Sequence, residues 1–316
     1  MVLEPGKMYR PTDIAVDFAN DAVYVVEQFN HRISKWDYTP GMFVFTLDTT
    51  WGDKTPTDGT AGTPGVAISD DDNNFYFPTS IALNSNDDLL VSDTLNHRIR
   101  VIDAATGTTF DSFGIPGTGS GGELHRPLGL DIDETQVKVM IADSFNHRIQ
   151  TFDVLTPYNF VTFTAPASPI PLHTPNGVTS KFDDSEFYVS DTVNGIINIY
   201  DQAGQTFLTQ KGTPGTETPD QLYHPGGGHV RSGSTKQYFA DTFNHAIKQS
   251  APGAIIDIIN NPGTGDGQLY HPNSVILFTD TADYVLVANT LNNRIEVFDD
   301  NSGTPLFQNN FGSPLP

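Results

Sequence analysis

One stretch of sequence returns along the whole chain, and its best-preserved copy runs from Leu90 to Asp103. Aligned on their central asparagine, the copies fall at Asn30, Asn96, Asn146, Asn194, Asn244 and Asn292. The intervals between them are 66, 50, 48, 50 and 48 residues. A repeat of this period indicates one supersecondary unit per copy, each burying its apolar faces against its neighbours. The repeat therefore restricts the fold to a stacked or radial array of six similar units.

Each copy lies about nineteen residues downstream of a proline that begins an alternating apolar segment. These prolines are Pro11, Pro78, Pro127, Pro175, Pro225 and Pro272. Proline has no N–H group to donate, so it suits the first residue of a strand. A short apolar strand, a turn that reads Asp-Thr-x-Asn in three units and varies in the others, a third strand and a looser fourth strand then follow, without a helical stretch. Four short strands per repeat are typical of a propeller blade.

The sequence thus predicts an all-β, six-bladed β-propeller of four-stranded antiparallel blades, in a single domain over residues 1–316. The expected blades span approximately residues 8–50, 75–114, 124–165, 172–212, 222–260 and 269–312. Residues 5–11 match the end of the 262–272 loop, and residues 311–314 match its beginning. Both ends of the chain then lie in one inter-blade loop. We expect each blade to be contiguous in sequence, with no strand exchanged between the first and last blades.

The repeated tripeptide resembles the signature of the NHL repeat family. It appears as Asn30-His31-Arg32, Asn96-His97-Arg98, Asn146-His147-Arg148 and Asn244-His245-Ala246. Two copies differ from the signature, Asn194-Gly195-Ile196 and Asn292-Asn293-Arg294. Glu27 and Asn289 also replace the usual aspartate of the turn. The resemblance covers essentially the whole chain and implies the same six-bladed propeller.

The repeated turn has a structural interpretation that needs no ligand. Its aspartate can accept backbone N–H groups, its asparagine tolerates the left-handed backbone conformation, and the following arginine can reach a carboxylate. Because every blade needs this turn, we expect function to lie where the repeat is broken or on the face that the turns form.

That face gathers most of the histidines. His31, His97, His147 and His245 lie in the turns, and His125, His173, His224 and His271 come one or two residues before an inner-strand proline. Aromatic and imidazole side chains offer large amphipathic contact areas at low entropic cost. We therefore predict a binding surface at the channel mouth, completed by Trp51 in the long first inter-blade loop. Its predicted contact residues are Trp51, His125, Arg126, Tyr223, His224, Tyr270 and His271.

Three polar residues interrupt the small and apolar inner strands: Asp13, Asp131 and His229. No cofactor is the main expectation, and a calcium or zinc ion held by these three side chains is the alternative. Two enzymatic branches of similar propellers inform this site. The amidating lyases that cleave peptidyl hydroxyglycine place zinc-binding histidines directly after the inner-strand prolines, where this chain has other residues. The related lactonases hold calcium in the channel, which the residue types here could imitate.

Composition narrows the range of partners. The formal net charge is −22, with a sequence pI near 4.4, and such a field repels phosphate backbones. We therefore expect no nucleic-acid partner. No apolar run is long enough to span a membrane, and no leader pattern begins the sequence. There is no cysteine, so disulfide and thiolate chemistry are excluded.

The sequence favours a non-enzymatic propeller that recognises a protein, a peptide or a glycan through its turn-bearing face. One alternative is a metal-dependent hydrolase or lyase with its site in the central channel. Another is a structural component of a virion or surface assembly, which the acidic, cysteine-free composition would suit. The residues leave the compartment and the oligomeric state open.

Overall fold

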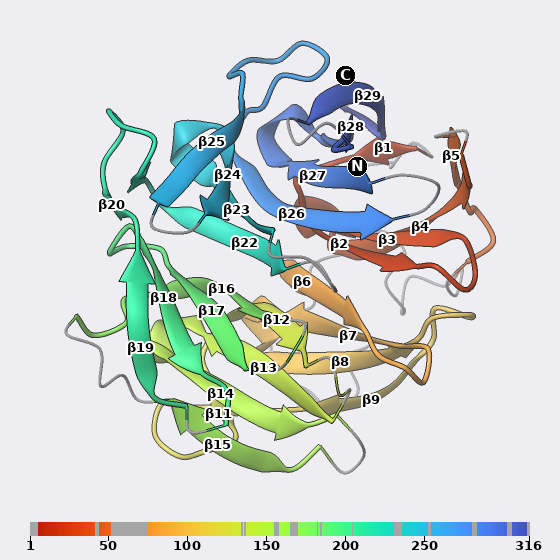
Figure 1. The fold of residues 1–316 in the computed structure, drawn as a ribbon. Helices are drawn as coiled ribbons and strands as arrows, with labels where there is room; N and C mark the ends of the chain where they lie inside the picture. The colour runs from red at the N-terminus through yellow and green to blue at the C-terminus, as the bar shows by residue number, and fades with distance from the viewer. Residues whose placement is uncertain are drawn as a thin grey trace.

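Six four-stranded antiparallel sheets surround a central channel in the computed structural model (Figure 1). All six inner strands begin at the prolines identified from the sequence. They are β2 (Pro11–Asp17), β6 (Pro78–Leu83), β12 (Pro127–Ile132), β16 (Pro175–Ser180), β22 (Pro225–Val230) and β26 (Pro272–Thr279). The predicted all-β, six-bladed propeller is confirmed.

The other strands of each blade follow in chain order, from the second strand to the outermost one. The second strands are β3 (Ala22–Glu27), β7 (Asp88–Asp93), β13 (Lys138–Asp143), β17 (Glu186–Asp191), β23 (Gln237–Asp241) and β27 (Asp283–Asn289). The third strands are β4 (Arg32–Thr39), β8 (Arg98–Asp103), β14 (Arg148–Asp153), β18 (Ile196–Asp201), β24 (Ala246–Ala251) and β28 (Arg294–Asp299). The outer strands are β5 (Val44–Leu47), β9 (Thr109–Phe113), β15 (Phe160–Thr164), β19 (Phe207–Lys211), β25 (Ala254–Asn260) and β29 (Leu306–Phe311).

The structure describes most of the chain. The described residues are 6–41, 44–51, 75–133, 135, 137–154, 158–164, 170–181, 183, 185–203, 205–230, 236–251, 254–279, 283–301 and 305–314. Most of the long insertion after the first blade, from residue 52 to residue 74, lies outside them. No helix in the described parts of the chain has both the length and the apolar character needed to cross a membrane.

The core consists of apolar layers between neighbouring blades. In β3, Val23 and Val25 pack against the sixth blade, whereas Tyr24 and Val26 pack against the second. Successive side chains of a strand point to opposite faces, so a strand between two blades must be apolar on both. This explains why every residue of β3 is buried. Each blade therefore needs both neighbouring blades to bury its apolar side chains.

The ring closes without exchanging a strand. Two-residue strand β1 (Lys7–Met8) pairs in parallel with β30 (Ser313–Pro314). Two continuous inter-blade loops contain the same small pairing, β10 (Ile115–Pro116) with β11 (Glu123–Leu124) and β20 (Thr213–Pro214) with β21 (Gln221–Leu222). β1 and β30 therefore complete one more loop of this type, directly after β29. The expectation of contiguous blades is confirmed.

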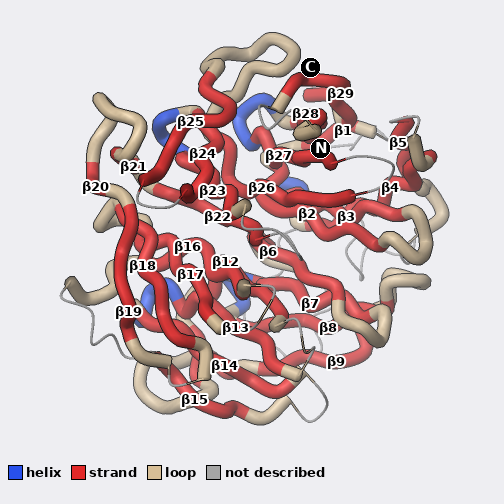
Figure 2. Tube along the Cα trace, viewed as in Figure 1, coloured by secondary structure: helices blue, strands red, loops and turns tan. Residues whose placement is uncertain are grey.

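The repeated turn is a single 3-10 turn in five blades, shown as short helical segments in Figure 2. These turns are η1 (Gln28–Asn30), η2 (Thr94–Asn96), η3 (Ser144–Asn146), η4 (Thr242–Asn244) and η5 (Thr290–Asn292). The residue with a left-handed backbone is the one after the asparagine, such as His97 at φ 58°. The expectation that the asparagine adopts this conformation is wrong, because its side chain is engaged elsewhere. The fourth and sixth blades place Gly195 (φ 64°) and Asn293 (φ 56°) at this position, and both residues tolerate it well.

Candidate functional site

The residue that ends each second strand, which is acidic in five blades and Asn289 in the sixth, organises the repeated turn. In the third blade, Asp143 accepts the backbone N–H of His125 at 2.7 Å through Oδ1. Its Oδ2 accepts from Asn146 Nδ2 at 2.9 Å and from Arg148 Nε at 2.7 Å. Asp143 is fully buried, so these donors replace the water that its charge has lost. One carboxylate thus joins the turn, the third strand and the preceding inter-blade loop.

In other blades, different residues provide the partners of the residue that ends the second strand. In the fifth blade Ala246 replaces the arginine, and Lys248 approaches Asp241 to 3.2 Å from two residues further along β24. In the sixth blade the acid and the amide exchange places, so Asn289 ends the second strand and Glu296 pairs with Arg294. The fourth blade has no such cation, and Asn194 and Asn198 both donate to Asp191. The irregular turns noted in the sequence are therefore compensated locally.

The turn histidines connect neighbouring blades. His97 Nδ1 accepts the backbone N–H of Arg126 at 3.1 Å, and His147 and His245 accept from Thr174 and His271 in the same way. Each donor has a left-handed backbone and directly precedes an inner-strand proline. In the sixth blade Asn293 Oδ1 accepts from Arg10 at 2.8 Å. These imidazoles must carry a free lone pair on Nδ1, so they act in the neutral form.

Stability should therefore respond to the protonation of His97. Burial, with further contributions from His125 and Arg126, lowers the pKa of His97 from the usual value of 6.5. Below pH 6.5, His97 is protonated in the unfolded chain more readily than in the folded chain. The contribution of His97 to stability therefore falls as the pH falls. We expect His97→Asn and the wild type to have similar free energies of unfolding in urea at pH 8. At pH 5 the variant should be the more stable of the two. A constant difference between the two proteins would contradict this role.

Six of the seven predicted binding residues lie together on the turn-bearing face, which we define as the six repeated turns and the two residues before each inner-strand proline. The carboxylates and amides of the turns hold the backbones of His125, Tyr223 and Tyr270, and turn histidines hold those of Arg126 and His271. His224 occupies the equivalent position in the fifth blade and also has a left-handed backbone. With the backbone fixed in this way, the side chains are free to face outward.

Aromatic side chains cluster on this face. Phe243, at the tip of η4, lies 5.3 Å from Tyr223, 4.7 Å from His224 and 4.5 Å from His271, measured between ring centroids. The guanidinium of Arg126 lies 4.7 Å from the ring centroid of Phe145. Phe145 and Phe243 are each 43% exposed, Tyr223 44% and Tyr270 40%. Large aromatic side chains left this exposed at a ring of turns form an accessible, semi-rigid surface.

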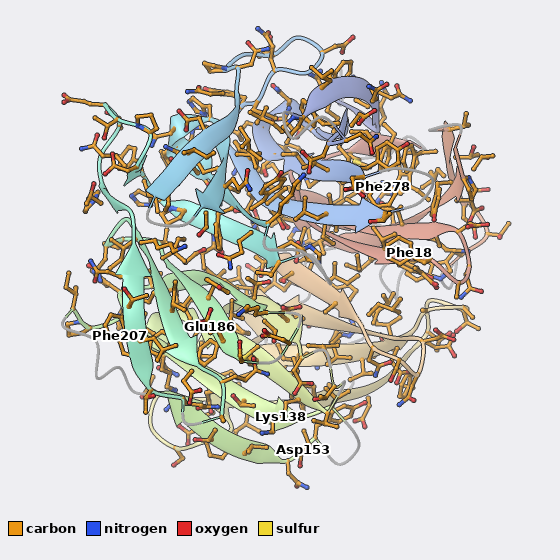
Figure 3. The ribbon with its side chains drawn as sticks, viewed as in Figure 1. Phe18, Lys138, Asp153, Glu186, Phe207 and Phe278 are labelled. Atoms are coloured by element: carbon orange, nitrogen blue, oxygen red, sulfur yellow. The ribbon has the colours of Figure 1, made fainter. Side chains whose placement is uncertain are left out.

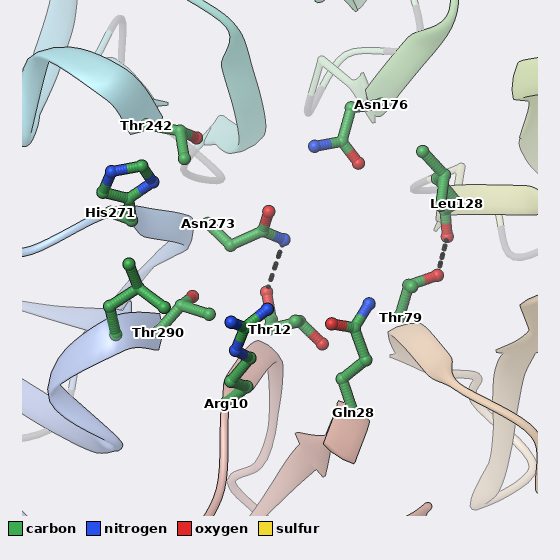
Figure 4. Close-up of a pocket in the computed structure, with 11 residues that line it drawn as sticks. Arg10, Thr12, Gln28, Thr79, Leu128, Asn176, Thr242, His271, Asn273 and Thr290 are labelled. Atoms are coloured by element: carbon green, nitrogen blue, oxygen red, sulfur yellow. Dashed lines mark hydrogen bonds between the residues drawn. The ribbon is translucent and has the colours of Figure 1, made fainter.

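A cavity of about 250 Å³ opens at the centre of this face, and we call it the central cavity (Figure 4). Side chains from the turns and from the first residues of the inner strands surround it. They are Arg10, Thr12, Gln28, Thr79, Leu128, Asn176, Thr242, His271, Asn273, Thr290 and Leu291. Of the predicted binding residues, His271 lines this cavity. Burial, followed by the nearby His245 and Arg10, lowers the pKa of His271, which leaves Arg10 as the cation of the cavity near neutral pH.

Trp51 is not brought together with the other six residues. Its indole Nε1 donates to the carbonyl of Ala104 at 2.7 Å, and its ring lies 5.5 Å from that of Tyr24. Ala104 follows the last residue of β8, whereas the turn-bearing face meets the first. Trp51 therefore packs between the first two blades, and its role as a ligand contact stays a prediction.

The three predicted metal ligands each bridge to another blade. Asp13 Oδ2 accepts from Ser80 Oγ at 2.6 Å and from Ile81 N at 3.0 Å, and Asp131 Oδ2 accepts from Ser180 N at 2.7 Å. His229 Nδ1 accepts from Leu277 N at 3.3 Å. Within the described residues, no three histidine, aspartate or glutamate side chains form a group that could hold a metal ion.

Burial in the channel dominates the protonation of these groups. It raises the pKa of Asp131 to about 7, against hydrogen bonds from Ser180 and Ile132, and Asp13 raises it further. Burial also raises the pKa of Asp13 and lowers that of His229 to about 4. All three side chains therefore tend towards the neutral state, and their clearest function in this geometry is to connect the inner strands.

Comparison with known proteins agrees with this architecture. The family model described as NHL repeat matches residues 75–102, which contain β6, β7 and the beginning of β8. The chain is a six-bladed propeller that contains an NHL repeat. No curated protein sequence matches it significantly.

Solved structures resemble this propeller in fold. A structure of streptogramin B lyase has a TM-score of 0.60 and 12% identity, and the match covers 100% of this chain and 86% of the lyase chain. Virginiamycin B lyase from Staphylococcus aureus, with selenomethionine in place of methionine, also gives 0.60 and 12%, over 97% and 85% of the two chains. At this identity the likeness concerns the fold alone.

Sequence reasoning missed most of the cavity lining, including Arg10, Thr12, Gln28, Asn176 and Thr242. One signal was available, because Gln28 stands where the five other blades have threonine or serine directly after the turn acid. Thr12 and Thr242 gave no such signal. Their residue type is ordinary at these positions, and only their surroundings distinguish them.

Proposed function

We propose that this NHL-repeat propeller is a non-enzymatic binding protein that recognises a protein, a peptide or a glycan through its turn-bearing face. The observation that carries the proposal is the set of exposed aromatic side chains on the face into which the central cavity opens. Phe145, Phe243, Tyr223 and Tyr270 are each at least 40% exposed. Rigid aromatic side chains near the centre of a surface commonly dominate the free energy of association.

The charges of this face support the same conclusion. Although the chain carries a net charge of −22, the turn acids, such as Asp93, Asp143 and Asp241, are fully buried. The guanidinium groups of Arg10 and Arg126 lie over phenylalanine rings, and no carboxylate among the described residues forms a salt bridge with either of them. The centre of the face therefore presents aromatic and cationic groups on an otherwise acidic protein.

Arrays of immobilised glycans and peptides test this proposal. We expect the wild type to bind members of one array and the double variant Phe145→Ser/Phe243→Ser to bind them at least about tenfold more weakly, because both changes remove an aromatic anchor. Phe18→Ser/Phe110→Ser is the matched control. Phe18 and Phe110 are 53% and 54% exposed but lie outside the turn-bearing face, so this variant should bind like the wild type. Failure to bind either array, or equal losses in both variants, would contradict the proposal.

A metal-dependent hydrolase or lyase is the second candidate. The supporting observation is that Asp13 and Asp131 lie close enough in the channel for one carboxylate to raise the pKa of the other. A calcium or zinc ion would relieve this repulsion. Elemental analysis of the protein after dialysis against each metal tests this candidate, and a stoichiometry well below one ion per chain would exclude it.

A further inference from the structure

The central cavity lies where a repeated inter-blade hydrogen bond is missing. In four blades, the hydroxyl that follows the turn acid donates to the carbonyl of the next inner-strand proline. These bonds join Thr94 to Pro127, Ser144 to Pro175, Thr192 to Pro225 and Thr290 to Pro11, at 2.6–2.9 Å. The fifth blade has Thr242 at this position, and its buried hydroxyl has no hydrogen-bond partner in the part of the chain that the structure describes. The first blade has Gln28, whose amide is turned towards Thr12 and Thr79 in Figure 4.

Two of the six residues that follow an inner-strand proline make a further bond to the next blade, and Thr12 does not. Directly after the inner-strand proline, Thr79 donates to the carbonyl of Leu128 at 2.9 Å, and Asn273 donates to that of Thr12 at 3.0 Å. Thr12 is only 3% exposed, yet its hydroxyl has no partner among the described residues. A buried hydroxyl without a hydrogen bond is destabilising, so an uncompensated one at a cavity wall suggests a bond made to a ligand.

Arg10 adds a charge to these polar groups. Its backbone N–H is used by Asn293, and its guanidinium lies 4.1 Å from the ring centroid of Phe29. No salt bridge of the described residues involves it, although the chain contains 38 acidic residues and only 16 lysines and arginines. The planar donor fork of arginine matches a carboxylate in a bidentate manner. The cavity therefore offers one site for an anionic oxygen pair and several sites for neutral polar groups.

We propose that the central cavity binds a carboxylated sugar, a uronic-acid-type residue at the end of a glycan, with its carboxylate against Arg10. This inference rests on the proposed binding function and specifies its ligand. The sugar hydroxyls meet the side chains that lack partners or face the cavity, which are Thr12, Gln28, Asn176 and Thr242. Hydroxyl and amide side chains both donate and accept hydrogen bonds, as sugar hydroxyls do.

The size and lining of the cavity favour a single sugar over a peptide terminus. A volume of about 250 Å³ lies just below the usual range for pockets that bury a drug-sized ligand, so it suits one terminal residue. A peptide carboxylate would bring an apolar or backbone segment that needs an apolar wall, whereas only Leu128 and Leu291 supply apolar side chains here. The exposed aromatic rings outside the cavity would contact the following sugars of the chain.

Calorimetric titration with simple glycosides tests the inference. Methyl glucuronide should bind, and methyl glucoside, which has the same ring without the carboxylate, should bind at least about tenfold more weakly. Arg10→Gln should weaken glucuronide binding by about tenfold or more and abolish the preference for the acid. Thr12→Val and Thr242→Val should each weaken glucuronide binding several-fold, because each removes a hydroxyl that has no partner among the described residues.

Lys138→Gln is the charge-matched control. Lys138 is exposed and begins β13, at the opposite end of that strand from the turn acid, and Figure 3 labels it. This variant should bind methyl glucuronide like the wild type. Equal binding of the two glycosides, no binding of either, or equal competition by an acetylated dipeptide with a free carboxyl end would overturn the inference. A different result would separate the two proposals. If Phe145→Ser/Phe243→Ser no longer binds an array ligand that the wild type binds, and the wild type does not bind methyl glucuronide, the binding function stands and only the assignment of the sugar fails.

Discussion

Replacing Arg148 with alanine is expected to destabilise the propeller by about 3–5 kcal/mol, the usual cost of removing one partner from a buried ion pair. Arg148 donates to Asp143 Oδ2 at 2.7 Å and to the carbonyls of Gly119, Ser120 and Glu123. Without it, the fully buried Asp143 loses its cationic partner, and the carbonyls of Gly119, Ser120 and Glu123 each lose one donor. Urea unfolding at pH 8 measures the loss.

The fifth blade supplies the rescue for this variant. There an alanine precedes Lys248, which reaches both Asp241 and the carbonyls of Pro219 and Gln221. Arg148→Ala/Gln150→Lys copies that arrangement into the third blade, where Gln150 already donates to Asp143. We expect the double variant to recover about half of the lost stability, as a favourable coupling energy in a double-mutant cycle. A double variant no more stable than Arg148→Ala would show that the two arrangements are not equivalent.

Met8→Ala is expected to lower the free energy of unfolding by about 2–5 kcal/mol, because the substitution leaves a cavity in the core. Met8 is fully buried in the apolar layer between the first and sixth blades, where β1 meets β30. The equivalent residues Leu124, Leu222 and Leu269 are also fully buried, but they lie in continuous loops. Only the pairing at Met8 joins two segments that are distant in sequence, so its weakening should open the ring locally before the protein unfolds.

Hydrogen exchange separates this opening from general destabilisation. In Met8→Ala, we expect the amides of β1 and β30 to exchange faster than those of β10 and β11, whereas Leu124→Ala should produce the reverse. Met8→Leu restores the residue used in the other loops and should change stability by less than about 1.5 kcal/mol. Uniform exchange in both alanine variants would mean that the closure is no weaker than the continuous loops.

The blades were predictable because their determinants are local. A proline at each strand start, period-two alternation and an acidic turn recur with little change, and each has a direct backbone consequence. The role of His97 was not predictable, since asparagine is the more usual left-handed residue. The structure shows that Asn96 Nδ2 donates to Asp93 Oδ2 at 2.9 Å. The next residue, His97, adopts the left-handed backbone conformation instead.

The central cavity was less accessible to sequence reasoning. Thr12 and Thr79 follow their prolines at the same position and have the same side chain, yet only the hydroxyl of Thr79 finds a carbonyl in the next blade. That difference depends on sub-ångström positions of neighbouring blades, which no residue pattern records. Gln28 was visible as an irregularity, but its meaning depends on Arg10 and Thr12 lying beside it.

The pairing of β1 with β30 also means that the order of the blades along the chain is not fixed by the architecture. Every blade is contiguous, and the first and last segments already meet in a loop like the others. A circularly permuted gene, with the present ends joined by a short linker and new ends placed between β10 and β11, would keep all six blades intact. Such a permutant would move the attachment point of the chain around the rim while leaving the turn-bearing face unchanged.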